Sequence, residues 1–165
     1  MFHIDPATEE DIPEILEIER EAFSPPWTHE ALSSELCRDD SFFAVARGAA
    51  DRNQYFVETR NSGGRAPQPV LGFVILRRTA DDGELLQIAV EKNARRRKVA
   101  DALMEAALGF AGGCKRGSVF LEVRKSNVAA ARLYEKHGFT PTRCRKDYYS
   151  DPIEDAVVMI REFVL

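Results

Sequence analysis

The stretch "ELLQIAVEKNARRRKVADALMEAALGFAGGCKRGSVFLEV", Glu84 to Val123, has the clearest secondary-structure pattern in the chain. Its opening residues form a nearly continuous apolar run, typical of a buried strand, and strong helix formers follow. Gly112 and Gly113 mark the end of that helix, and "SVFLEV" returns to a strand pattern. A strand, a helix and a second strand in this order predict a right-handed parallel crossover.

The segments on both sides add further strands and helices. Thr8 opens a first helix with Asp11 in a capping-box arrangement, and the prolines of "FSPPW", 23–27, end it. The full order predicts one α/β domain over residues 1–165, with a mixed sheet of about seven strands flanked by about four helices. We expect strands at residues 2–5, 41–47, 70–78, 84–91, 118–123, 139–149 and 155–163. We expect four helices: one that begins at residue 8, one over 29–38, one that follows the basic cluster and ends at about 111, and one in 126–138 that stops at Gly138.

Residues 48–69 interrupt this pattern. They are rich in Gly, Asn, Arg and Pro, and they are long for a connection between two neighbouring strands. We interpret them as an inserted surface loop, with a functional flap as the alternative.

Composition excludes several classes of protein. The net charge is −4 and the pI is about 5.5, whereas nucleic-acid-binding domains are usually basic. No apolar run approaches the 18 or so residues of a membrane span, and the acidic N-terminus lacks a signal-peptide layout. Three cysteines without a CxxC pair are typical of a reducing compartment, so we expect a cytoplasmic protein. The three histidines have no metal-ligand spacing, and no metal is expected.

The densest positive charge lies where a helix begins. Five cations occur within the seven residues Lys92–Lys98. Each should cost roughly 0.3–1 kcal/mol near the positive end of the helix dipole, so an anion is needed to hold them. A strand that leads into a helix N-terminus is a phosphate site, and arginine adds bidentate recognition. The sequence indicates a pyrophosphate, and the alternative is that these side chains extend into solvent.

A second group of polar residues follows the next strand. Asn127 and Tyr134 are seven residues apart, so they share a helix face about 10 Å apart, with Ala130 and Ala131 between them. Glu122 lies near the carboxyl end of the preceding strand, where α/β sheets usually bind ligands. These residues are candidates for one cleft. Taken singly, a surface glutamate and a half-buried core tyrosine remain the alternatives.

The stretch "LEVRKSNVAAARLYEKHGF", Leu121–Phe139, resembles the central signature of the GNAT superfamily of acetyl-CoA-dependent N-acetyltransferases. The resemblance covers most of the chain, including "IAV" before the basic cluster, "F...PW" early on and "YY...EDA" near the end, and it is weakest at 48–69. It implies a GNAT fold and an enzyme with acetyl-CoA as cosubstrate. The chain is similar in particular to the bacterial members of the family that acetylate the N-terminal alanine of a ribosomal protein.

The resemblance places the CoA pyrophosphate at "RRRKVA", Arg95–Ala100, where the family has a Q/R-x-x-G-x-G/A loop. Lys98 stands in place of the first glycine, and Ala100 is a common variant of the second. A lysine there is expected to bring the backbone less close to the phosphate, while its charge compensates. The implied cofactor-binding residues are Ile88, Ala89, Val90, Arg95, Arg96, Arg97, Lys98, Val99, Ala100, Asp101 and Asn127.

The chemistry implied by the resemblance is a direct transfer with no metal and no acetyl-enzyme. Glu122 would be the general base, acting through a water, and Tyr134 the general acid for the CoA thiolate. Trp27, Tyr148 and Tyr149 are the candidates for gripping the acceptor peptide. The acids of the last hairpin would attract a basic tail, or they are merely solvated: Asp147, Asp151, Glu154 and Asp155.

Two rival functions remain at this point. One is a GNAT acetyltransferase acting on a small amine such as a polyamine or an aminoglycoside. The other is a CoA-binding regulatory module without activity, which Lys98 would favour and the presence of Glu122 and Tyr134 opposes. For the enzyme we expect a protein N-terminus as partner, no membrane or nucleic acid, and a monomer or weak dimer.

Overall fold

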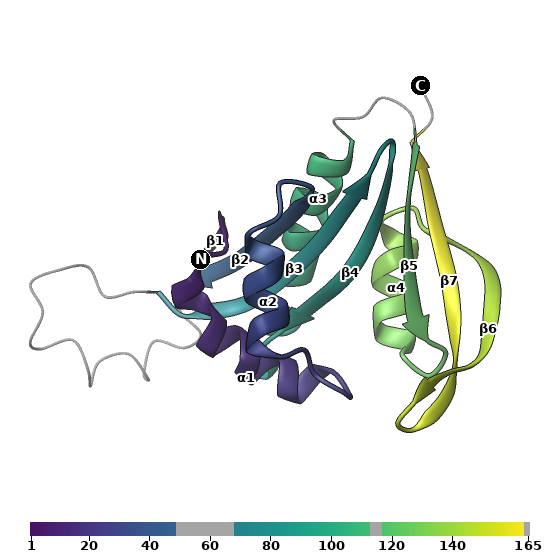
Figure 1. The fold of residues 1–165 in the computed structure, drawn as a ribbon, viewed down its shortest axis with the longest axis horizontal. Helices are drawn as coiled ribbons and strands as arrows, with labels where there is room; N and C mark the ends of the chain where they lie inside the picture. Colours follow the sequence, from purple (N-terminus) through teal and green to yellow (C-terminus); the bar gives the residue numbers. More distant parts are fainter. Residues whose placement is uncertain (49–67, 113–116, 164–165) are drawn as a thin grey trace, which may run out of the picture.

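The structure is a computed structural model that describes residues 1–48, 68–112 and 117–163. Seven strands and four α-helices follow one another in the predicted order (Figure 1). The predicted α/β class is confirmed. The strands are β1 (Phe2–Pro6), β2 (Ser41–Gly48), β3 (Val70–Thr79), β4 (Asp82–Val90), β5 (Gly117–Arg124), β6 (Thr140–Ser150) and β7 (Ile153–Phe163), and the α-helices are α1 (Ile12–Ala22), α2 (His29–Leu36), α3 (Val99–Ala111) and α4 (Val128–Lys136).

Local capping explains where two of the four α-helices and one 3₁₀ turn begin. The Thr8 N–H donates to Asp11 Oδ2 over 2.8 Å, as the capping box predicts. That box caps a short 3₁₀ turn, Glu9–Asp11, and the α-helix itself begins at Ile12, later than the sequence predicts. Thr28 and Asn127 cap α2 and α4 by accepting backbone N–H groups with their side chains.

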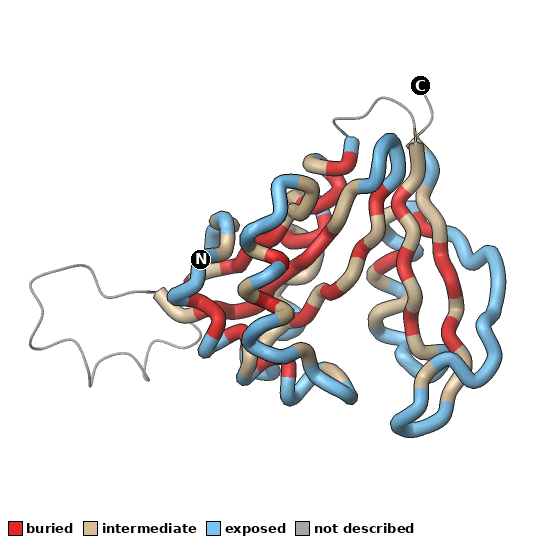
Figure 2. The backbone as a smooth tube through the Cα atoms, in the orientation of Figure 1, coloured by how far each residue is buried: buried red, intermediate tan, exposed pale blue. Residues whose placement is uncertain are grey.

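All seven strands form one mixed sheet in the order β1-β2-β3-β4-β5-β7-β6. Only the β4–β5 pair is parallel, and α3 connects these two strands, so the predicted parallel crossover is present. One hydrophobic core fills the space between the sheet and helices α3 and α4. A second core lies under α1 and α2 on the opposite face, and the buried residues in Figure 2 follow both.

The parallel pair is short, and this shapes the site. Among the described residues, β4 and β5 pair only at Gly83–Val119 and Glu84–Phe120, and beyond these pairs the two strands diverge (Figure 1). The register between β3 and β4 also shifts, because Leu86 of β4 is an extra residue between two paired positions. The last residues of β4 therefore hydrogen-bond to β3 on one side and have an open edge on the side of β5.

Residues 49–67 lie outside the described residues, so the prediction of an inserted loop at 48–69 stays a prediction. Cys114, one of the three cysteines, also lies outside them. In the part of the chain that is described, no helix is long and apolar enough to cross a membrane. The same part holds no cluster of three potential metal ligands.

Candidate active site

The basic cluster forms a tight loop between a 3₁₀ turn, Lys92–Ala94, and helix α3. Arg96 and Lys98 both have positive φ angles, +60° and +64°, in the left-handed region. Glycine adopts this conformation without a steric penalty, and other residues pay about 1 kcal/mol or more. The need for a left-handed residue just before the helix is a physical reason for a glycine at this position, and Lys98 meets it with some backbone strain.

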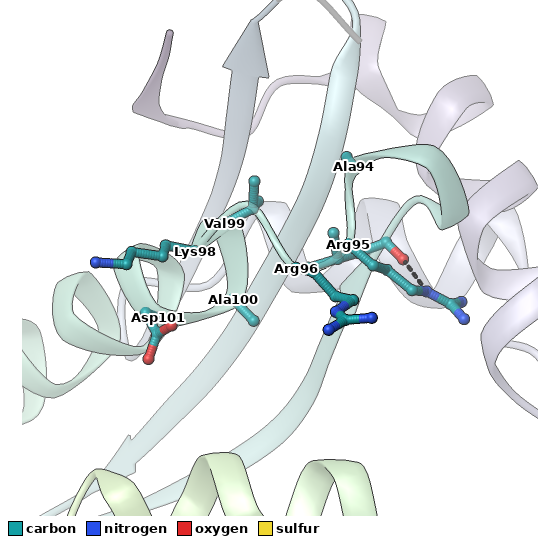
Figure 3. Close-up of a pocket in the computed structure, with 8 residues that line it drawn as sticks. Ala94, Arg95, Arg96, Lys98, Val99, Ala100 and Asp101 are labelled. Carbon is teal, nitrogen blue, oxygen red and sulfur yellow. Dashed lines mark hydrogen bonds between the residues drawn. The ribbon is translucent and has the colours of Figure 1, made fainter.

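The start of α3 presents backbone donors to a pocket. Ala102 N–H is bonded to the Lys98 carbonyl over 3.1 Å, so the N–H groups of the three residues before it have no partner within the helix. Seven of the eleven predicted cofactor residues line one pocket together with Ala94 (Figure 3). They are Val90, Arg95, Arg96, Lys98, Val99, Ala100 and Asp101. Free N–H groups, arginines and a helix N-terminus in one pocket suit a phosphate group.

The charged side chains of this pocket have separate roles. Arg95 Nε donates to the Val90 carbonyl over 3.1 Å and so ties the loop to the end of β4. Figure 3 shows the Lys98 side chain extending away from Arg95 and Arg96. Lys98 nevertheless lines the pocket, so the expectation that its charge compensates for the missing glycine stays a prediction.

Asp101 is the one acidic residue that lines this pocket, and its charge is balanced by helix α4. Its carboxylate is ion-paired with Lys136 and lies 3.0 Å from His137 Nε2. The hydrogen bond from Lys136, followed by that from His137, lowers the pKa of Asp101. This pairing leaves the pocket with the net positive charge of the arginines and fixes α4 against the first turn of α3.

The open edge of β4 leads from this pocket toward β5. Ile88, Ala89 and Val90 pair with β3 on one side, and β5 has already diverged on the other. An extended ligand can add to such an edge through main-chain hydrogen bonds. These are the residues predicted to bind the acetyl and pantetheine groups, and their position favours that role. Asn127, predicted to bind the cofactor, caps α4 by accepting the Ala130 N–H over 3.1 Å.

A second cluster surrounds Glu122 on β5. Its carboxylate is ion-paired with Arg145 of β6, a partner that the sequence did not reveal. Arg145 also lies 4.7 Å from the centre of the Tyr148 ring. A hydrogen bond to Glu122 is the main cause of a raised pKa at Tyr148. The predicted base and one predicted substrate residue are therefore in direct contact.

Tyr134 and Tyr149 extend this cluster to helix α4. Tyr134 is 8% exposed, and burial raises the pKa of its hydroxyl well above the ordinary value, with a smaller contribution from Tyr149. Burial and then the charge of Glu122 raise the pKa of Tyr149 to about 12. Tyr149 thus interacts electrostatically with both predicted catalytic residues. A tyrosine kept neutral at physiological pH can donate a proton to a developing anion.

Glu84 is a carboxylate of this cluster that the sequence interpretation missed. Glu84 pairs with Phe120 in the last β4–β5 pair, and Glu122 lies two residues further along β5, so the two carboxylates are on the same face of the sheet. Burial first, and the nearby charge of Glu122 second, raise the pKa of Glu84. The sequence gives little indication that Glu84 belongs to the site, because a polar residue at the start of an apolar strand is common.

Trp27, the remaining predicted substrate residue, lies in the loop between α1 and α2. It packs against the second core, and its N–H donates to Glu19 Oε2 over 3.0 Å. Glu19 is fully buried, and burial raises its pKa to about 7. A buried carboxylate beneath Trp27 holds this loop at a fixed height over the sheet.

Three of the four acids proposed to attract a basic tail accept hydrogen bonds, either within the β6–β7 hairpin or from neighbouring loops. Glu154 accepts the Ser126 N–H over 2.6 Å, Asp155 accepts the Asp147 N–H over 3.1 Å, and Asp151 accepts the Ser24 hydroxyl over 3.2 Å. These contacts favour a structural role for the three carboxylates over attraction of a basic peptide.

The structure thus has a pocket suited to an anion at the start of α3, an open strand edge at the end of β4, and a carboxylate–tyrosine cluster around Glu122. Residues 12–139 match the model of the Acetyltransferase (GNAT) family. The chain belongs to the GNAT family. It is an N-acetyltransferase that uses acetyl-CoA as its cosubstrate.

Individual relatives of this GNAT acetyltransferase agree with that assignment. It is 31% identical to the [ribosomal protein bS18]-alanine N-acetyltransferase of Escherichia coli K12, over 90% of this chain and 89% of the relative. The crystal structure of the ribosomal-protein-S18-alanine N-acetyltransferase from Escherichia coli superposes with a TM-score of 0.77 at 26% identity, covering 100% of this chain and 96% of that one. Arabidopsis thaliana NAA60 in complex with acetyl-CoA shares the fold, with a TM-score of 0.79 at 18% identity and 98% coverage of both chains.

Replacing Lys98 tests the strained loop. Lys98→Gly should raise the free energy of unfolding by about 1 kcal/mol, because glycine adopts the left-handed conformation without strain. This corresponds to a melting temperature higher by about 2–4 °C in a domain of this size. Lys98→Ala is the matched control, since it removes the charge but keeps the Cβ atom. Equal stability of the Gly and Ala variants in thermal unfolding would contradict the strain.

Replacing Arg96 tests the anion pocket. Arg96→Ala should weaken acetyl-CoA binding by about 1–3 kcal/mol, the range for hydrogen bonds to charged groups. Lys92→Ala, an exposed cation that does not line the pocket, serves as the control and should bind normally. Calorimetry that finds the same affinity for both variants would return the cluster to a solvated surface role.

Proposed function

We propose that this GNAT acetyltransferase transfers the acetyl group of acetyl-CoA to the N-terminal α-amine of a protein, an alanine of a small-subunit ribosomal protein, in the cytoplasm. The observation that carries this proposal is the cluster around Glu122, where the predicted base contacts Tyr148 and interacts electrostatically with Tyr149. In this proposal, an extended peptide end lies in a groove between these tyrosines and Trp27. The similarity to enzymes named for the alanine of ribosomal protein bS18 supports this acceptor.

The proposed mechanism is a direct transfer. Glu122 accepts the proton of the α-amine, through a water, as the nitrogen attacks the thioester carbonyl carbon. Backbone N–H groups at the open edge of β4 stabilise the negative charge on the carbonyl oxygen. When the carbon–sulfur bond breaks, Tyr134 donates its proton to the leaving sulfur and is then reprotonated from solvent. The Tyr134 hydroxyl is protonated at neutral pH and so has a proton to donate, and its burial, which raises its pKa, makes it a weaker acid than an exposed tyrosine.

The choice of amine follows from proton chemistry. An α-amine has a pKa of about 7.7–8.0, and a lysine side chain has one of about 10.4. At neutral pH the lysine amine is therefore uncharged several hundredfold less often than the α-amine. A groove between Trp27 and Tyr149 also favours a small first side chain, because a misfit there costs about 1–3 kcal/mol.

The test uses peptides that are identical after residue one and begin with Ala, Ser, Leu or acetyl-Ala. The peptide with Ala should react fastest, and the acetyl-Ala peptide should be inert. Spermidine and an aminoglycoside are included as acceptors for the rival enzyme function. Faster turnover of either small amine would replace this proposal. Binding of acetyl-CoA without turnover of any acceptor would favour the regulatory module.

A further inference from the structure

Arg124, the last residue of β5, contacts both sides of the proposed acceptor groove. Its Nη2 donates to the Ser24 carbonyl over 3.1 Å and to the Asp151 carbonyl over 2.7 Å. Its Nη1 donates to the Pro152 carbonyl over 3.1 Å and to Glu154 over 3.3 Å. One guanidinium thus joins the α1–α2 loop to the turn between β6 and β7, although these segments are more than 120 residues apart in the chain.

The same side chain also supports an aromatic residue of the groove. The guanidinium carbon lies 4.2 Å from the centre of the Tyr149 ring. Only 20% of the Arg124 side chain is exposed, so its hydrogen bonds are partly shielded from water. Arg124 lies within the signature stretch Leu121–Phe139, but the sequence alone indicates no role for it.

The α1–α2 loop is attached to the rest of the protein at two points. Trp27 is held from below by Glu19, and Ser24 is held from the side by Arg124. The segment between these attachments is the groove wall that carries Trp27. Without Arg124, the loop would keep its attachment to α1 but lose its link to the hairpin, apart from the single hydrogen bond between Ser24 and Asp151.

We propose that Arg124 is a positioning residue for the acceptor: it holds the α1–α2 loop and the β6–β7 hairpin at the spacing that grips the peptide end. It does not touch the acetyl group or the reacting amine. This inference rests on the proposed function, because it assumes a peptide between Trp27 and Tyr149. A planar guanidinium makes the four hydrogen bonds in a fixed fork, and a lysine ammonium cannot reproduce that geometry.

The experiment measures steady-state kinetics of Arg124→Lys with the Ala peptide. We expect the KM for the peptide to rise about tenfold, because the groove is no longer pre-organised, with kcat and the Kd for acetyl-CoA within about twofold of the wild type. Arg143→Lys is the matched control. Arg143 is an exposed arginine of β6, and its replacement should leave all three values unchanged. An unchanged peptide KM in Arg124→Lys would overturn the inference.

A purely structural role for Arg124 would change other quantities. It would lower kcat and weaken acetyl-CoA binding in step with a loss of thermal stability, and that pattern would also overturn the inference. A fall in kcat alone would do the same, because it would mean that Arg124 acts through Glu122, its neighbour on β5. Failure of the proposed function is recognised separately, since the wild type itself would then not acetylate the peptide.

A spectroscopic readout keeps the inference testable if Arg124→Lys loses activity. Trp27 is the only tryptophan in the chain, so its fluorescence reports on the α1–α2 loop alone. Acrylamide quenching of Trp27 should increase in Arg124→Lys and fall again when the peptide is added. In a double-mutant cycle, Arg124→Lys combined with Trp27→Ala should change the logarithm of the peptide KM by less than the sum of the two single variants. Unchanged quenching, or fully additive effects, would contradict the coupling.

Discussion

Tyr134→Phe should lower kcat by roughly 10²–10⁴, the usual contribution of a positioned acid or base, while acetyl-CoA binds nearly as well as before. The substitution keeps the aromatic ring, which packs edge to face against Phe139 with 6.0 Å between ring centres. Only the buried hydroxyl is removed, so the leaving sulfur must take its proton from water. Stopped-flow measurement of thiol release in a single turnover follows this step directly.

Tyr149→Phe is the matched control for that variant. Tyr149 also has a raised pKa, but it belongs to the groove and not to helix α4. Its replacement should mainly change the KM for the peptide. A near-normal kcat in Tyr134→Phe, or an equal loss in both variants, would remove Tyr134 from the role of acid.

Glu122→Gln should be the second large effect, with kcat lower by roughly 10²–10³ and the loss greatest at low pH. Below the pKa of about 7.7–8.0 the α-amine is mostly protonated, so the reaction depends most on a base there. At high pH the amine is already neutral, and the rate of the variant should approach that of the wild type. A pH profile of kcat/KM with the Ala peptide measures this convergence.

Glu84→Gln distinguishes the two neighbouring carboxylates. If Glu122 takes the proton, Glu84→Gln should change the rate much less, and it should do so mainly by altering the field around Glu122. A large loss in Glu84→Gln with a small loss in Glu122→Gln would assign the base to β4. Equal losses would indicate that the two carboxylates act as a pair.

The order of strands and helices was predictable because each signal is local. The apolar run after Glu84, the capping pattern at Asn127 and the glycine after α4 each report on a few neighbouring residues. The prediction for the first helix began too early, since a capping box also starts a 3₁₀ turn. The extra residue at Leu86 was not predictable, because a bulge depends on pairing with another strand.

The basic loop before α3 was predictable as a feature from its composition, and its role in binding a pyrophosphate stays a prediction, but its backbone conformation was not predictable. The sequence indicated an anion site at Arg95–Ala100, whereas the left-handed conformation of Lys98 needs the path of the whole loop. The long-range contacts were also hidden. Glu122 and Arg145 are 23 residues apart, and Arg124 and Ser24 are 100 apart. No spacing rule connects residues at such distances, and only the packing of β5 against its neighbours brings them together.

The central claim is that the acetyl group goes to an α-amine. One peptide that carries both a free N-terminal alanine and a single internal lysine tests it most directly. After incubation with acetyl-CoA and limiting enzyme, tandem mass spectrometry locates the acetyl group on the peptide. We expect acetylation of the alanine nitrogen with the lysine unmodified. Acetylation of the lysine side chain, with the alanine left free, would contradict the account.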